Sequence, residues 1–175
     1  MATTVSGRIS EIIFARFEPH EDLRQGLIKI IKEKDIKSGI VLSITGALEK
    51  ATLQHASGVG EPTIPLEIIH VQGPLEVSGH GIIGEVEAPE FSDSVLGLGE
   101  HFLHGDPYLH VHLTVTSAKE TLCGHLLDGC TVRSNHPVSH FTIILGRIEG
   151  AILKMACKRG NKPGSLIVAH ELVQL

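Results

Sequence analysis

Two histidines in the segment 109–115 (LHVHLTV) have the spacing of a metal-binding pair. The segment alternates strictly between apolar and polar residues, which predicts a β-strand with its leucines and valines toward the core and its histidines on the opposite face. On such a strand His110 and His112 lie about 6.5 to 7 Å apart at Cα. Both rings can then reach one cation, since a zinc ion lies about 2.0 to 2.1 Å from each histidine nitrogen. The pattern therefore predicts two ligands of a metal site.

A third histidine is expected to join this pair. Residues 117–121 suit a hairpin turn, and a return strand over 122–126 with the turn centred near 118–119 places His125 opposite His112. Zinc sites with three protein ligands keep a fourth position open for water or substrate. A simpler interpretation stays open, in which the histidines only cover a solvated strand face.

Two further residues are candidates for chemistry near the histidines. Cys123 lies two residues before His125 and is expected on the same strand face, where it would be a soft ligand, a reactive thiol or simply a small packed residue. Glu76 lies just before a glycine-rich bend and is our candidate for a catalytic acid. Beside a metal ion, such an acid would assist a bound water acidified toward neutral pH or a polarised carbonyl group.

The segment 79–84 (GHGIIG) has the letters of the dinucleotide-binding motif G-x-G-x-x-G. That motif requires a helix to follow, whose N-terminus receives the pyrophosphate, but residues 85–89 (EVEAP) contain two acids and a proline. Glycines in a bent or bulged strand explain the segment better, and they leave His80 without an assigned role. The sequence also contains neither a nucleophile elbow nor a P-loop, so it gives no support for serine catalysis or nucleotide hydrolysis.

The composition favours a folded domain and disfavours nucleic acid as a partner. Of the 175 residues, 42% are apolar and 20% are charged, as is typical of compact proteins. Fifteen Lys and Arg against twenty Asp and Glu give a net charge of −5, whereas binding to phosphates requires positive charge. Aromatic residues, which stack on bases, are only 3%. The twelve histidines are the unusual feature, and they direct attention to metal chemistry.

The cysteines and the N-terminus predict a cytoplasmic protein. Cys123, Cys130 and Cys157 are odd in number and form no C-x-x-C pair, so they do not describe a disulfide framework. The first residues lack the basic start and apolar run of a signal peptide. No stretch approaches the roughly 20 apolar residues that span a bilayer, so no membrane association is expected.

The elements that must position the histidines form one α+β domain over residues 1–175. Pro19 and the acids after it mark the start of an amphipathic helix that continues to Lys34. Residues 88–107 predict a loop with one helical turn. Because short turns join most strands, we expect a mostly antiparallel mixed β-sheet with one main amphipathic helix. The predicted strands are 8–17, 40–45, 50–55, 66–71, 75–78, 109–115, 122–127, 140–145, 151–155 and 165–169.

Adjacent isoleucine pairs indicate that both faces of this sheet are covered. The pairs lie at 12–13, 68–69, 82–83 and 143–144, and on a strand each pair places one isoleucine on each face. One helix of about fourteen residues covers only part of one face, so the loop 88–107 or another subunit must cover the rest.

Several segments, taken in order, resemble one family. They are 16–23 (RFEPHEDL), 39–48 (GIVLSITGAL), 73–79 (GPLEVSG), 107–112 (PYLHVH) and 123–126 (CGHL), and they resemble the PPC domain that plants and prokaryotes share. Prokaryotic members have a P-x-L-H-x-H and G-G-H-L pattern. Three positions differ from the family pattern: Cys123 replaces a glycine, His20 stands where glycine is frequent, and Pro74 replaces an arginine of plant members.

The resemblance implies a function as well as a fold. It implies that His110, His112 and His125 bind zinc or a similar divalent ion, and that the chain forms a homotrimer. The fold group also includes acetolactate decarboxylase and an ester hydrolase with three-histidine zinc sites, so a small-molecule lyase or hydrolase is expected. The alternative is a DNA-binding or regulatory protein, although the AT-hooks of plant members are absent from this sequence. A metal-dependent sensor without catalysis is a third hypothesis.

Overall fold

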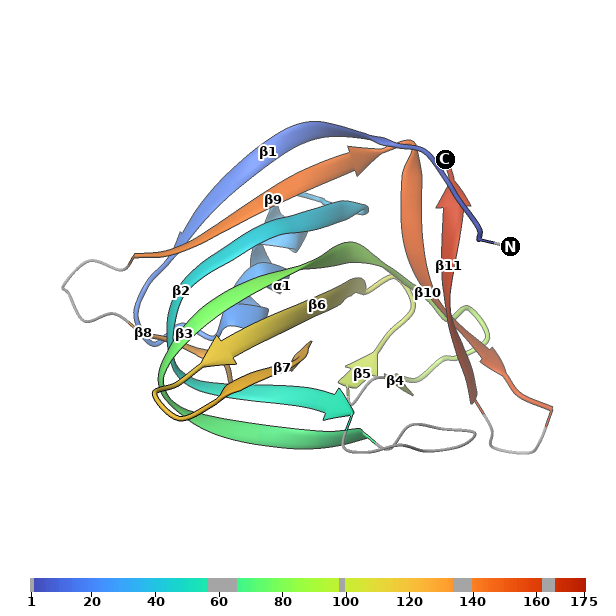
Figure 1. Cartoon of the computed structure of the whole chain (residues 1–175). Coiled ribbons are helices and arrows are strands. Elements are labelled where there is room, and N and C mark those ends of the chain that lie inside the picture. Colours follow the sequence, from blue (N-terminus) through green and yellow to red (C-terminus); the bar gives the residue numbers. More distant parts are fainter. Residues whose placement is uncertain (1, 57–65, 98–99, 134–139, 162–165) are drawn as a thin grey trace.

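The computed structural model describes residues 2–56, 66–97, 100–133, 140–161 and 166–175. Within these ranges it contains one α-helix and eleven β-strands, most of which belong to one mixed sheet (Figure 1). The α+β prediction is therefore confirmed. In the part of the chain that the structure describes, no helix is long and apolar enough to cross a membrane. The elements are β1 (Arg8–Phe17), α1 (Leu23–Glu33), β2 (Gly39–Ala56), β3 (Leu66–Glu87), β4 (Val95–Gly97), β5 (Glu100–Phe102), β6 (Pro107–Thr116), β7 (Thr121–Leu126), β8 (Thr131–Arg133), β9 (Phe141–Glu149), β10 (Ala151–Arg159) and β11 (Leu166–Gln174).

The sheet is strongly curved and partly closed. Its strands follow the order β1-β9-β2-β7-β6-β3-β10-β11, and β2 also pairs with β3 along most of its length. The pairings β2–β3, β3–β6, β6–β7 and β7–β2 therefore form a ring of four strands. Nearly all pairings are antiparallel, as expected, and the exception is a short parallel contact of β3 with β10. Figure 1 shows β10 and β11 crossing the right-hand side of the molecule at a steep angle to β6.

The predicted amphipathic helix is present as α1; it begins at Leu23, directly after the predicted proline and acids, and ends at Glu33, one residue before the predicted end. The Asp22 carboxylate caps it by accepting hydrogen bonds from the backbone N–H of Gln25 at 3.0 Å and of Gly129 at 2.7 Å. Leu23, Leu27 and Ile31 point into the core and are buried. The cap therefore attaches the helix to the segment that leaves β7, which carries one of the predicted metal ligands.

Three details of the predicted elements were wrong. Segments 40–45 and 50–55 form one strand, β2. Its pairing with β3 shifts register after Val41 and after Leu48, as at a β-bulge, and the strand continues through the residues between the two segments. Segments 66–71 and 75–78 likewise merge into β3. In the region 88–107, the described residues form the β4–β5 hairpin and no helical turn.

Among the residues that the structure describes, buried side chains form two cores of different size. The larger core has 25 of these buried residues between α1 and the concave side of the sheet, including Leu113 and Cys130. The smaller core lies where the β10–β11 hairpin covers the opposite side of the sheet. Its seven buried residues are Val86, Ala88, Phe102, Tyr108, Leu153, Met155 and Cys157.

Candidate metal centre

Strand β6 separates the larger core from the histidine face as predicted. Leu109, Val111 and Leu113 are buried in the larger core. The alternate side chains point to the other face, where His110 is half-buried and His112 is exposed. The alternation of the sequence alone therefore places both imidazoles outside the ring of strands.

The β6–β7 hairpin has the register that the sequence predicts. His112 lies directly opposite His125, and one ring nitrogen from each of His110, His112 and His125 lies within 4.8 Å of the others. Tetrahedral ligation with zinc–nitrogen distances of about 2.0 to 2.1 Å requires nitrogens roughly 3.4 Å apart, so small rotations of the rings are sufficient. Three imidazoles without a carboxylate suit zinc and neighbouring transition metals better than calcium or magnesium. The three residues fit a divalent transition-metal ion.

Burial keeps these rings in the form that binds metals. His125 is only 5% exposed, and its burial, reinforced by the neighbouring His110 and His112, lowers its pKa from 6.5 to about 4. The pKa of His110 is lowered in the same direction, first by burial and then by His170 and His112. Both imidazoles are therefore neutral at pH 7, and a metal ion needs no deprotonation step to bind them.

Two residues that the sequence analysis did not assign contact the site. The buried Tyr108 hydroxyl lies 3.1 Å from Nδ1 of His110 and 2.8 Å from Nε2 of His170. His170 belongs to β11, and its ring centre is 4.9 Å from that of His110. The hydroxyl at 108 was a detectable signal, because residues 108 and 110 share a strand face. The long-range strand pairing that places His170 of β11 next to Tyr108 of β6 could not be predicted from local sequence.

The remaining candidates lie around the histidines on the same face. Exposed His80 is directly opposite His112, so β3, β6 and β7 present a row of three histidines at residues 80, 112 and 125. Cys123 is exposed and lies opposite Thr114, which places it on the predicted face, and it does not belong to the group of converging ligand atoms. His80 therefore lies beside the three clustered histidines and is not a member of their group.

Glu76 lies apart from the three histidines. It is exposed on β3 and faces Thr116, whereas the residue of β3 that faces His112 is His80. Four residues of strand separate the two positions, which corresponds to about 13 Å. The structure does not bring Glu76 to the centre, and its catalytic role stays a prediction from the sequence that this separation disfavours.

The glycine-rich segment 79–84 is part of strand β3, as the rejection of the dinucleotide motif requires. A Cβ at Gly81 would collide with the carbonyl oxygen of His110 and approach Cα of Val111 to 2.7 Å. A Cβ at Gly84 would collide with the carbonyl oxygen of Leu153 on β10. These glycines allow β6 and β10 to approach β3 closely, so they position the ligand strand and not a phosphate.

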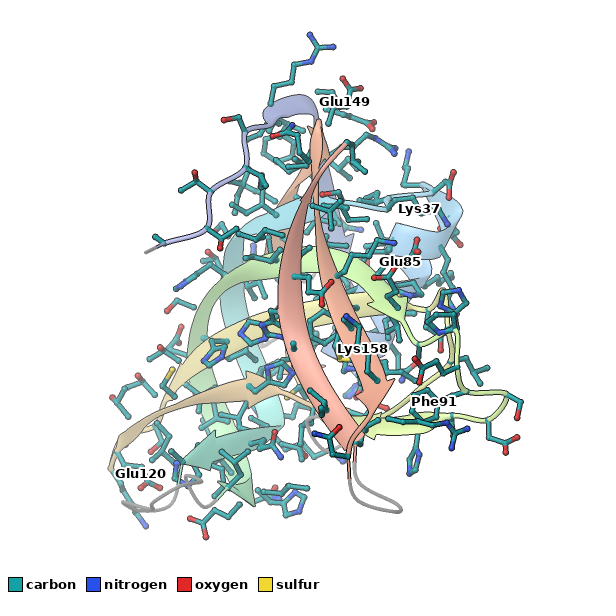
Figure 2. All side chains as sticks on the ribbon, turned by 90° about the vertical axis from the view of Figure 1, so that its right-hand side faces the viewer. Lys37, Glu85, Phe91, Glu120, Glu149 and Lys158 are labelled. Atoms are coloured by element: carbon teal, nitrogen blue, oxygen red, sulfur yellow. The ribbon has the colours of Figure 1, made fainter. Side chains whose placement is uncertain are left out.

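Figure 2 views the molecule from the side of the β10–β11 hairpin, which crosses in front of β6. The labelled Glu85 lies beside this hairpin, and its carboxylate is 3.6 Å from the ammonium group of Lys154 on β10. Glu87 lies 3.5 Å from the same ammonium group. The two ion pairs hold β10 against the end of β3, and they fix the hairpin over the Tyr108 end of the histidine face.

Comparison with known proteins identifies relatives of known fold. The chain is 29% identical over 120 residues to the bifunctional protein GlmU of Synechococcus sp. (strain JA-2-3B'a(2-13)), and these residues are 67% of this chain but only 14% of that protein. A metal-containing protein from Archaeoglobus fulgidus has a similar structure, with a TM-score of 0.66, 15% identity and coverage of 88% of this chain and 91% of the other.

A protein from Bacteroides thetaiotaomicron, provisionally described as DNA-binding, also has this fold. Its TM-score is 0.57 at 19% identity, over 95% of this chain and 98% of that one. The model of the Plants and Prokaryotes Conserved (PCC) domain matches residues 4–138, which is most of the chain and includes all three clustered histidines. The chain therefore belongs to the Plants and Prokaryotes Conserved domain family.

Proposed function

We propose that this protein binds one divalent transition-metal ion, most simply zinc, through His110, His112 and His125. The observation that carries the proposal is the convergence of three ring nitrogens within 4.8 Å on the β6–β7 hairpin. The lowered pKa of His125 supports it, because a neutral imidazole binds metal without competition from protons at pH 7. The description of the Archaeoglobus relative as metal-containing is consistent with it.

We further propose that the ion serves small-molecule lyase or hydrolase chemistry. When bound by three histidines, zinc supplies an open position that acidifies water or polarises a carbonyl oxygen. The chain itself contributes the strand face around the histidines. On one side of them this face is polar, with Ser78, Thr114 and Cys123. On the other side it is apolar, with Ile40 and Ile82. This face is suited to a small ligand with one polar and one apolar end.

Metal analysis of protein purified without a His-tag column tests the first proposal. We expect about one zinc-like ion per chain, and we expect the double variant His110→Ala/His112→Ala to lose it. A matched control is His55→Ala/His70→Ala, which removes two histidines of the paired strands β2 and β3 and leaves the cluster intact. Unchanged metal content in the first variant would contradict the ligand assignment.

DNA binding is the second candidate function, and the description of the Bacteroides protein favours it. The net charge of −5 opposes it, because phosphate contacts require cationic side chains. A salt titration with duplex DNA separates the two. We expect no sequence-dependent binding at physiological salt, and sub-micromolar sequence-dependent binding would place regulation ahead of catalysis.

We also propose that the protein assembles as a homotrimer. One row of paired residues crosses five neighbouring strands. It runs from Ile12 on β1 through Gly146 on β9, Ile40 on β2 and Ile82 on β3 to His110 on β6. Ile12 is 46% exposed and Ile82 is 42% exposed, so an apolar row leads across the open face to the metal ligands. A second copy of the chain would cover this row and bring its own surface near the site.

Light scattering tests the assembly. We expect a mass near three times 18.8 kDa for the wild type and a smaller mass for Ile12→Glu. Ile167→Glu is the control, since Ile167 is similarly exposed on β11 and does not belong to the row. A wild-type monomer that keeps its metal would contradict the trimer.

A further inference from the structure

The hydroxyl of Tyr108 joins the metal cluster to the C-terminal hairpin. Tyr108 is fully buried in the smaller core, where its ring packs edge-on against Phe102 with centres 5.8 Å apart. Its hydroxyl lies 3.1 Å from Nδ1 of His110 and 2.8 Å from Nε2 of His170. A buried hydroxyl is retained where it is hydrogen-bonded, and here it lies within hydrogen-bond distance of two histidines.

The two hydrogen bonds have a direction that metal binding fixes. Because Nδ1 of His110 contacts the hydroxyl, Nε2 is the nitrogen left for the metal. A neutral imidazole that binds a metal through Nε2 carries its proton on Nδ1, so His110 donates to Tyr108. The tyrosine hydroxyl can then donate its proton to Nε2 of His170.

We propose that Tyr108 and His170 are positioning residues that hold His110 in the Nδ1-protonated form and aim its Nε2 at the metal. This inference rests on the proposed function, since it assigns roles around the same three ligands. It adds a strand outside residues 4–138, because His170 lies on β11. Partners of this kind fix the ring orientation of a ligand, and their loss typically weakens metal binding about 10- to 100-fold.

The fold explains why His170 reaches the hydroxyl from so far along the chain. Met155 and His170 are direct partners in the β10–β11 hairpin, and Met155 is buried in the smaller core beside Tyr108. Partners in an antiparallel pair point to the same face, so the side chain of His170 faces Tyr108 as well. The parallel contact of β10 with β3 and the ion pairs of Lys154 keep this face over β6.

The first test uses the metal-free protein and nuclear magnetic resonance of the ring nitrogens. We expect His110 to be protonated at Nδ1 in the wild type, and we expect Tyr108→Phe to shift it toward the Nε2-protonated form that free histidine prefers. A wild-type His110 protonated at Nε2 would overturn the proposal. This measurement needs no metal, so it reports the tautomer of His110 separately from metal affinity.

The second test measures cobalt and zinc affinity and the visible spectrum of the cobalt form. Tyr108→Phe keeps the ring in its core and removes only the hydroxyl, so we expect affinity to fall about 10- to 100-fold and the cobalt spectrum to shift. His170→Ala should behave alike, whereas His170→Gln keeps an acceptor for the tyrosine proton and should restore part of the affinity.

Phe102→Leu is the matched control for packing. It disturbs the ring that contacts Tyr108 and leaves both hydrogen bonds, so we expect lower thermal stability with unchanged metal affinity. If the wild type binds metal and Tyr108→Phe binds it equally well with the same spectrum, the positioning role is refuted and the proposed function stands. If the wild type binds no metal, the proposed function and this inference fail together.

Discussion

The hairpins β6–β7 and β10–β11 both reach the candidate metal centre, and they are built in different ways. The first joins two strands through a short turn and buries its inner side in the larger core of 25 residues. The second lies over the outer face through a parallel contact of only three residue pairs, and the smaller core of seven buried residues supports it. The ligands therefore lie on the more firmly packed hairpin, whereas the group that orients one of them lies on the less firmly packed one.

This difference predicts that the site combines a rigid part, the β6–β7 hairpin, and an adjustable part, the β10–β11 hairpin. Local stability varies across a structure with the buried contacts that each region has. Strand β11 is at the edge of the sheet, where its neighbour is β10, and its Ile167 and Leu172 are exposed. Opening of that hairpin would release His170 without moving His112 or His125.

Lowering the pH should have the largest effect on stability, and it should act through His125 on the β6–β7 hairpin. The pKa of His125 is about 4 in the folded protein and 6.5 in the unfolded chain, so the unfolded chain binds the proton first as pH falls. The metal-free protein should therefore lose up to about 3 kcal/mol of stability from this residue as the pH falls from about 7 to about 4, and very little at higher pH. Urea unfolding at several pH values measures it.

His125→Asn is the reference for this measurement, since it removes the titrating group and keeps a polar side chain. The gap in unfolding free energy between wild type and variant should shrink as pH falls through the range. A gap that stays constant from pH 7 to pH 4 would mean that His125 titrates normally, and the site would then be more hydrated than its 5% exposure implies.

Two glycine substitutions on β3 should distinguish the contributions of the two hairpins to metal binding. Gly81→Ala places a methyl group against the backbone of His110, and Gly84→Ala places one against the backbone of Leu153 on β10. Each should cost roughly 1 to 3 kcal/mol of stability, because a closely packed site has to move. Gly81→Ala should weaken metal binding through His110 directly. Gly84→Ala should weaken it only as far as His170→Ala does.

Metal titration and thermal unfolding of the two variants, measured side by side, check this. Equal losses of metal affinity beyond the effect of His170→Ala would show that the hairpins move as one body. The division of the site into a rigid and an adjustable part would then be wrong.

Local signals predicted the rigid hairpin well. The strict alternation around His110 and His112 and the turn centred at 118–119 lie within about 20 residues, and both the face and the partner of His112 were predicted from them. The helix was predicted for the same reason, since Asp22 caps it and the apolar spacing follows at once. Where the residues that determine an element are adjacent in sequence, their local pattern is sufficient to predict that element.

Long-range pairing limits what local sequence can predict. Glu76 lies in strand β3, which continues through the following glycines in register with β6, and its catalytic role stays a prediction. The contribution of His170 depends on the contact of β10 with β3, which joins residues far apart in the sequence. The three-residue strand β8 was not predicted, because so short a segment has no periodicity to recognise.

The smallest expected effect is a difference in local opening, and two buried cysteines can report it. Cys130 belongs to the larger core and Cys157 to the smaller one, and burial raises the pKa of both thiols, that of Cys130 to about 12. Neither should react with a thiol reagent until its region opens. In a Cys123→Ser background, which removes the exposed thiol, Cys157 should be labelled at least about tenfold faster than Cys130.

A tenfold difference corresponds to about 1.4 kcal/mol less free energy for opening the smaller core. Labelling in denaturant corrects each rate for the intrinsic reactivity of its thiol, so that only the opening step is compared. The Cys130 rate should follow global stability as urea is added, whereas the Cys157 rate should respond weakly, since a local opening exposes less surface. Identical rates with identical urea dependence would make the two cores one cooperative unit, and His170 would then be held as firmly as the metal ligands themselves.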